Sequence, residues 1–235
     1  MRKQQQIWHQ EHTTRGTLPT MANVEPTSGV TLFAQYLEQR GIPFSGNAVD
    51  IGAGKGRNSI YLAQLGYTVT ALEYVEPAVT VARQLAQANN LADKITFKLA
   101  EIDRVWEVSD SYFDVAIDSF ASIDIETKAG RQICRDEMFR TLKPGGLGFV
   151  NVCSVDDEWE KQLIVEHPGP EPNSTLWPQN GKFQKDYSEE ELKDFYKMFE
   201  IVELKKLTKP AFKLGRKGIA TNLWLVVRKL RIKYS

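Results

Sequence analysis

One glycine-rich stretch constrains the fold of this chain more than any other feature, and it runs Val49-Asp50-Ile51-Gly52-Ala53-Gly54-Lys55-Gly56. Its pattern is typical of a buried strand that enters a tight turn and then a helix. Glycine has no Cβ atom, so it tolerates positive φ and lets a ligand approach the backbone closely. The helix that follows begins with unpaired N–H groups, which suit a nucleotide-like ligand. We therefore expect this turn to hold a cofactor.

The next segment completes a βαβ unit. Residues 67–72 are typical of a second strand, and Glu73 follows it about twenty residues after the glycines. Dinucleotide-binding folds place an acid at this point, where it accepts hydrogen bonds from ribose hydroxyls. The spacing here is G-x-G-x-G with Asp50 before it, whereas nicotinamide and flavin sites usually begin with G-x-G-x-x-G. Glycines also mark ordinary turns, but here strand, turn, helix, strand and acid stand in the required order.

Strand and helix patterns alternate through the rest of the chain. Further strand runs lie at 95–99, 113–118, 147–152, 201–204 and 223–227, which makes seven predicted strands. Helical spacing predicts helices over about 28–40, 59–65, 76–90, 126–142 and 188–199. Lys143-Pro144-Gly145-Gly146 should end the fourth of these helices before the fifth strand. Such alternation indicates a parallel sheet covered on both faces, and we expect the last two strands to be antiparallel to each other.

Two segments fall outside this alternation. Residues 1–27 are mostly polar and predict an N-terminal arm or lid ahead of a single domain over 28–235. At about 156–187 the pattern dissolves into a proline-rich stretch that is long for a plain connection, and we expect a substrate cap there. Three tryptophans lie in these two segments: Trp8, Trp159 and Trp177. They either close an aromatic pocket over a small substrate or anchor their loops onto the core.

Composition narrows the class of partner. The formal net charge is zero, so no overall field draws the chain to nucleic acid or to a membrane. Ten lysines and arginines but no acid follow Glu203, which leaves a solvated basic face and a nucleic-acid footprint both open. The two cysteines, Cys134 and Cys153, give no disulfide framework and fit a reduced compartment. No apolar run suits a signal peptide or a bilayer span, which predicts a soluble cytoplasmic protein.

Several of these stretches resemble one known family. The glycine stretch with Asp50 resembles the first motif of class I S-adenosylmethionine-dependent methyltransferases, and 112–115 and 142–146 resemble their fourth- and fifth-strand motifs. The run 54–59 followed by Tyr61-Leu62-Ala63 is similar to the tellurite-resistance and thiopurine group of small-molecule methyltransferases. Over about residues 45–230, the resemblance implies a Rossmann-like, doubly wound, seven-stranded α/β sheet. Its strand order would be 3214576, with strand 7 antiparallel and helices on both faces.

The resemblance assigns cofactor-binding roles to the first half of the site. Asp50, Gly52, Ala53 and Gly54 would line the methionine and ribose portion of S-adenosylmethionine. Glu73 would bind the ribose diol. These residues lie on the strand, turn and strand end that the sequence pattern predicts independently.

The second half of the site follows from the same resemblance. Tyr74 would pack on the adenine, Glu101 would accept from its amino group, and the Ile102 N–H would meet the ring. Asp118 and Ser119 would lie near the methionine amino group and the reacting methyl, at the carboxyl end of the fourth strand, where open α/β sheets bind ligands. Glu101 departs from the family because aspartate is commoner at this position.

The implied reaction is direct methyl transfer to a small-molecule O, N, S or heavier chalcogen atom, with S-adenosylhomocysteine as product. Alignment of the reacting atoms lowers such a barrier by roughly 7–11 kcal/mol, and no metal is required. A base is needed only if the acceptor must lose a proton, and Asp118 or Tyr187 are candidates. Each also has a structural role open to it: Asp118 in cofactor binding, and Tyr187 in packing beside the Ser188 cap. His9 and His12 alone make a poor metal site.

Other functions remain open at this level. A nicotinamide-dependent oxidoreductase would use the same βαβ unit, although the glycine spacing and the Lys-Pro-Gly-Gly turn disfavour it. An RNA or protein methyltransferase would use the basic C-terminal region and bind in a salt-sensitive way. A protein that binds S-adenosylmethionine without catalysis is a further alternative. We expect a monomer or homodimer with a small-molecule acceptor as its partner.

Overall fold

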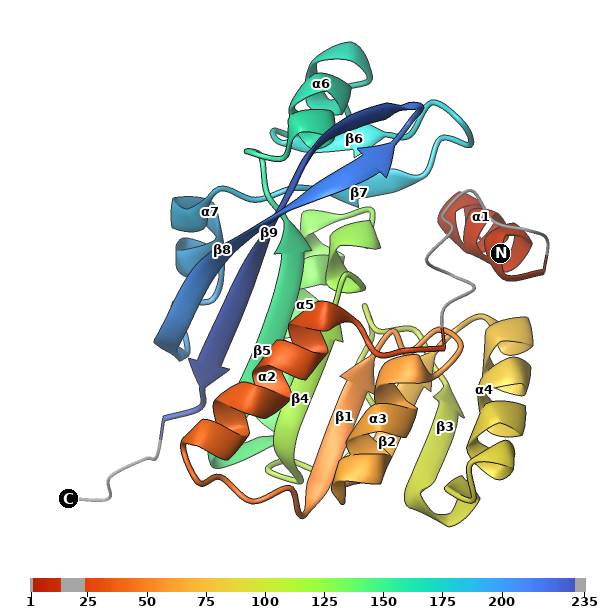
Figure 1. Cartoon of the computed structure of the whole chain (residues 1–235), viewed down its shortest axis with the longest axis vertical. Helices are drawn as coiled ribbons and strands as arrows, with labels where there is room; N and C mark the ends of the chain where they lie inside the picture. The colour runs from red at the N-terminus through yellow and green to blue at the C-terminus, as the bar shows by residue number, and fades with distance from the viewer. Residues whose placement is uncertain (1, 14–23, 231–235) are drawn as a thin grey trace.

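The computed structural model describes residues 2–13 and 24–230. Within these ranges the main sheet has seven strands in the order β3-β2-β1-β4-β5-β9-β8 (Figure 1). The strands are β1 Asn47–Ile51, β2 Thr68–Glu73, β3 Ile95–Leu99, β4 Phe113–Ser119, β5 Leu142–Cys153, β8 Glu200–Lys213 and β9 Arg216–Arg228. Strand β9 is antiparallel to both β5 and β8, and the other pairings are parallel. This confirms the expected order 3214576, since β9 is the seventh strand of the sheet along the chain.

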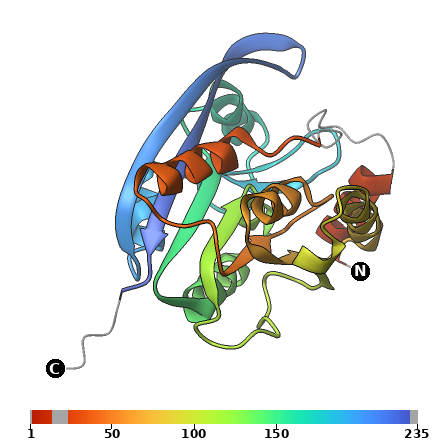
Figure 2. The same cartoon turned by 60° about the horizontal axis from the view of Figure 1, so that its bottom comes forward.

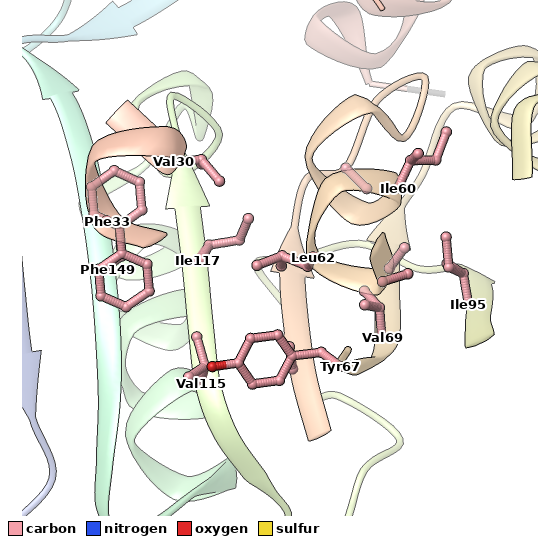
Figure 3. Packing of buried hydrophobic residues seen from close by; sticks show 14 of the residues in the cluster. Val30, Phe33, Ile60, Leu62, Tyr67, Val69, Ile95, Val115, Ile117 and Phe149 are labelled. Carbon is pink, nitrogen blue, oxygen red and sulfur yellow. The ribbon is translucent and has the colours of Figure 1, made fainter. Parts of the chain in front are cut away.

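Helices cover both faces of the sheet (Figure 2). One face carries α2 Ser28–Gln39, α3 Arg57–Leu65 and α4 Glu76–Ala88, and the other carries α5 Lys128–Thr141 and α7 Glu189–Phe195. Successive strand residues point to opposite faces, so Val115 and Ile117 enter the first core and Ala116 the second. In Figure 3 the Phe33 ring of α2 stacks on Phe149 of β5, with 5.1 Å between ring centroids.

The segment 156–187 is partly regular, so the expectation that the pattern dissolves there holds only between its short elements. It contains α6 Glu158–Glu166 and a small antiparallel hairpin of β6 Ser174–Leu176 and β7 Phe183–Lys185. Asp157 caps the start of helix α6, because its carboxylate accepts from the N–H groups of Trp159 and Glu160. Each hairpin strand has three residues, which is too short for alternation to be recognised. We call 156–187 the cap.

Other boundaries shift modestly. Helix α5 begins at Lys128 rather than 126, because the Thr127 hydroxyl accepts from Gly130 N and caps the helix there. The Lys-Pro-Gly-Gly turn belongs to β5, since Gly145 N donates to Lys229 O at 2.7 Å and joins the turn to the end of β9. Strands β8 and β9 run well beyond the predicted lengths as one long hairpin. No helix among the described residues is long and apolar enough to cross a bilayer.

Candidate active site

The glycine turn lies where the carboxyl ends of the central strands meet. Ile51 pairs with Leu72 of β2 on one side and with Asp118 of β4 on the other. This register brings the turn, the end of β2 and the end of β4 to one edge of the sheet. Open α/β sheets bind ligands at such an edge.

Two of the three glycines are required by close packing as well as by backbone conformation. Gly52, Gly54 and Gly56 all have positive φ, of 66°, 55° and 81°. A Cβ on Gly52 would lie 2.4 Å from Ala121 Cβ, and one on Gly56 would lie 2.9 Å from Ala82 Cβ. At Gly54 the nearest atom to a Cβ is 3.6 Å away, on the His12 ring. A Cβ at Gly54 would therefore make an ordinary contact with His12 of the N-terminal helix and would not clash.

The carboxylates of Asp50 and Glu73 fix the conformation of this turn through hydrogen bonds. Ser59 Oγ donates to Asp50 Oδ2 at 2.6 Å, and burial raises the pKa of Asp50 to about 7. Gly54 N donates to Glu73 Oε2 at 2.8 Å, while the N–H groups of Tyr74 and Val75 donate to Oε1. Burial raises the pKa of Glu73, and the three N–H groups oppose that rise. Oε2 accepts a single described N–H and so retains capacity for a ribose hydroxyl.

The end of β4 turns sharply back toward the glycines. Asp118 is buried, and its Oδ1 accepts from the N–H groups of Ala121 and Ser122, both at 3.1 Å. These bonds fix the start of the 3₁₀ turn η3 Ser122–Asp124. Burial raises the pKa of Asp118, and hydrogen bonding from the Ser122 side chain and from the same N–H groups opposes the rise. The Ser119 hydroxyl is hydrogen-bonded to the Thr27 hydroxyl at 3.0 Å, which brings the start of α2 to the site. The candidate roles of Asp118 as base and ligand stay predictions.

The N-terminal helix α1 Lys3–Thr13 lies over the carboxyl ends of the strands (Figure 1). Both terminal nitrogens of Arg2 donate to the Asp103 carboxylate, and Gln5 Nε2 donates to Glu101 Oε1. Glu101 also pairs with Arg2 at 3.4 Å and with Arg104 at 3.2 Å. The acid predicted to meet the adenine amino group is thus in direct contact with the arm.

The same helix reaches the cap. Gln4 pairs with the backbone of Phe183 in β7 as a neighbouring strand would: Phe183 N donates to its Oε1 at 3.0 Å, and its Nε2 donates to Phe183 O at 3.1 Å. Gln4 Nε2 also donates to Asp124 O at 3.1 Å. Asn180 Nδ2 in the cap donates to Glu11 Oε1 at 2.9 Å. Sequence reasoning missed Arg2 and Gln4, because isolated polar side chains in a polar arm have no periodic signal.

The remaining predicted residues occupy two different places. Ile102 is buried and its carbonyl accepts from Trp106 Nε1 at 3.1 Å, while Tyr74 is half-buried beside Glu73. Tyr187 is buried between the cap and α7, where its ring packs on Phe195 with 6.0 Å between centroids. Burial raises the pKa of Tyr187. Its N–H donates to Cys153 O at 3.0 Å, so it fastens the cap to β5.

The tryptophans lie in two places, and the aromatic pocket over a substrate stays a prediction. Trp8 of α1 and Trp177 of the cap both face the Lys182 ammonium, with ring centroids 4.7 and 4.8 Å from Nζ. Trp159 is buried, and its Nε1 donates to Lys213 O at 2.9 Å, so it anchors the β8–β9 hairpin on α6. In the part of the chain that the structure describes, no three His, Cys, Asp or Glu side chains are arranged to hold a metal ion.

Comparison with known proteins shows what this part of the chain is similar to. Residues 48–146 match the family model of the methyltransferase domain. This part of the chain is similar to class I methyltransferase domains. The matched range includes the glycine turn, Glu73, Asp118 and the Lys-Pro-Gly-Gly turn, so the resemblance recognised from those motifs is confirmed.

Relatives and solved structures agree with that assignment. The probable S-adenosylmethionine-dependent methyltransferase TehB of Haemophilus influenzae is 26% identical over 155 residues, which are 66% of this chain and 46% of TehB. The chain therefore spans about half the length of this curated relative. A methyltransferase structure from Methanosarcina mazei has a TM-score of 0.72 at 22% identity and covers 88% of this chain and 99% of its own.

A second solved structure carries ligands. The 1,6-didemethyltoxoflavin N1-methyltransferase of Burkholderia thailandensis was solved with its acceptor and S-adenosylhomocysteine. It has a TM-score of 0.62 at 18% identity and covers 87% of this chain and 79% of its own. At these identities the two solved structures establish the shared fold.

Proposed function

We propose that this chain transfers a methyl group from S-adenosylmethionine to a small-molecule nucleophile. The observation that carries the proposal is the turn at Gly54, whose N–H donates to Glu73 Oε2 at the edge where three strands end. S-adenosylmethionine, when bound, supplies an electrophilic methyl on its sulfonium. The residues proposed to hold it are Asp50, Gly52, Ala53, Gly54, Glu73, Tyr74, Glu101, Ile102, Asp118 and Ser119.

These residues divide the work. Asp50 would mainly support the turn, since one of its carboxylate oxygens already accepts from the Ser59 hydroxyl. This hydrogen bond joins β1 to α3. Glu73 would accept from a ribose hydroxyl through Oε2, and Tyr74 would present its ring beside it. The arm would close over the ligand, because Arg2 and Gln5 already contact the acids beyond β3. Closure excludes water and aligns the reactants, which is the main catalytic task in such a transfer.

The structure gives no special support to a nucleic-acid or protein substrate. Many cations of the basic C-terminal run pair with acids elsewhere: Lys205 with Glu203, Lys206 with Asp156 and Glu189, Lys213 with Glu160, Arg216 with Glu158, and Arg228 with Glu200. The basic C-terminal residues therefore lie beside carboxylates in the folded chain, although few acids lie near them in the sequence. A small acceptor under the arm and cap fits these contacts better than a polyanion on the hairpin.

The test is calorimetric titration of the whole chain with S-adenosylmethionine, S-adenosylhomocysteine and NADH. We expect the first two to bind and NADH not to bind. Glu73→Ala should weaken S-adenosylhomocysteine binding by about tenfold to a hundredfold, because a charge-assisted hydrogen bond contributes roughly 1.5–3 kcal/mol. Glu107→Ala removes an exposed acid and serves as the matched control. Binding of NADH alone, or equal affinities for the two variants, would contradict the proposal.

A further inference from the structure

The cap carries a buried cation that faces the arm. Lys182 directly precedes β7, and its side chain is 6% exposed. The backbone around it is fixed, because Lys182 N donates to Asn180 Oδ1 at 3.0 Å and Trp177 N donates to Lys182 O at 2.8 Å. Its ammonium lies close to the indole rings of Trp8 and Trp177. Cation–π contacts offset part of the cost of burying an ammonium, but they do not replace a hydrogen-bond acceptor.

A buried acid stands opposite this cation. Asp124 ends η3, and its side chain is 11% exposed. Its Oδ1 has no hydrogen-bond partner among the described residues, and burial raises the pKa of this carboxyl to about 6. Lys182 Nζ lies 3.9 Å from that oxygen, which is beyond hydrogen-bond distance. A buried carboxylate and a buried ammonium thus face each other without closing a direct bond.

The pair lies between the cofactor edge and the cap. Ala121, three residues before Asp124, occupies the space above Gly52. Gln4 of the arm joins Asp124 O to the backbone of Phe183, the residue after Lys182. Trp8, which covers the ammonium, belongs to the same helix. An opening of α1 would therefore uncover the ammonium and release the backbone of Asp124.

The separation fits one bridging oxygen. An oxygen about 2.8 Å from Nζ and about 2.7 Å from Oδ1 forms a triangle on the observed 3.9 Å, with an apex angle near a right angle. Such an oxygen must donate to the carboxylate and accept from the ammonium. A hydroxyl does both, whereas a carboxylate would be repelled by Asp124 and an ammonium by Lys182. The two indoles would provide flat apolar walls for an aromatic ring.

We propose that Asp124 and Lys182 bind the reacting hydroxyl of the methyl acceptor, and that the acceptor is a phenol-type hydroxylated aromatic compound. This rests on the proposed methyl transfer. The phenol proton moves to Asp124, while Lys182 keeps its proton and stabilises the phenolate. The phenolate oxygen bonds to the methyl carbon as the carbon–sulfur bond breaks and its electron pair stays on sulfur. The products are an aryl methyl ether and S-adenosylhomocysteine.

The first experiment uses 4-nitrophenol, whose phenolate absorbs visible light, with the whole chain and S-adenosylhomocysteine. At a pH below the solution pKa of the phenol, we expect the bound probe to show the phenolate band. Lys182→Met should abolish the band, and Lys182→Arg should restore part of it. Lys161→Met, which removes an exposed lysine of the cap, is the control and should leave the band unchanged. A wild-type protein that binds the cofactor product but gives no phenolate band would overturn the proposal.

The second experiment tests whether Asp124 acts as a general base or has only a structural role. Asp124→Asn should slow methylation of weakly acidic phenols by about a hundredfold or more, the usual worth of a general base. It should slow methylation of 4-nitrophenol by less than about tenfold at a pH where that phenol is already ionised. An equal loss for both phenols would refute the assignment of Asp124.

Measurement of S-adenosylhomocysteine affinity distinguishes a failure of the phenol assignment from a failure of the proposed methyl transfer. S-adenosylhomocysteine affinity should be unchanged in Asp124→Asn, Lys182→Met and Lys161→Met, which also shows that each variant folds. If the wild-type chain binds no S-adenosylmethionine, the proposed function itself fails. If it binds S-adenosylmethionine and methylates thiols or amines but no phenol, the proposed function stands and the phenol assignment is wrong.

Discussion

The contact between Gly52 and Ala121 gives a quantitative test of how the active-site edge is built. A Cβ at position 52 would lie 2.4 Å from Ala121 Cβ, against about 3.5–4.0 Å for unstrained carbon contacts. The two segments would have to separate by more than about 1 Å, and overpacking of this kind typically costs 1–3 kcal/mol. The positive φ of 66° adds about 1–2 kcal/mol for a residue with a Cβ. Gly52→Ala should therefore lower the free energy of unfolding by about 2–5 kcal/mol.

Two companion variants separate those contributions. Gly54→Ala has the same backbone requirement, but its nearest neighbour is 3.6 Å from the new Cβ, so only the cost of positive φ, about 1–2 kcal/mol, should appear. Ala121→Gly combined with Gly52→Ala removes the clash and should recover the overpacking part. Urea unfolding measures all of these variants, with the m-value checked for constancy. Equal losses for Gly52→Ala and Gly54→Ala, or no recovery in the double variant, would refute this reasoning.

Two further predictions concern the arm and the buried acid. Gln4→Leu removes three hydrogen bonds between α1, η3 and β7. Amide hydrogen exchange in α1 should become faster, and the affinity for S-adenosylhomocysteine should fall by about tenfold. Unchanged exchange rates would mean that other contacts hold the arm in place. Asp50, whose pKa burial raises from 3.8 to about 7, binds its proton more tightly in the folded state. Its contribution to stability is present below about pH 4 and lost as pH rises toward 7. Unfolding titrations should show a shallower decline over that window in Asp50→Asn, and an unaltered pH profile would contradict the assignment.

The sequence patterns determined the βαβ unit and the number of sheet strands, and the family resemblance implied the order of those strands. The turn at Gly52, Gly54 and Gly56, the strand that ends in Glu73 and the helix that starts at Glu76 are set by neighbouring residues. Period-two and period-3.6 patterns record which face of each element is buried, so they survive without tertiary information. The family motifs lie on these same elements, and the cofactor class followed from them.

Only the tertiary structure decided how the site is covered. Gln4 meets Phe183 across 179 positions of sequence, and Lys182 meets Trp8 and Asp124 from three separate elements. Each of these contacts depends on one polar side chain, and one side chain produces no periodic pattern. The cap hairpin was missed because its strands have three residues each. The sequence therefore predicts where the cofactor site lies, whereas the contacts that the arm and cap make above that edge depend on long-range packing.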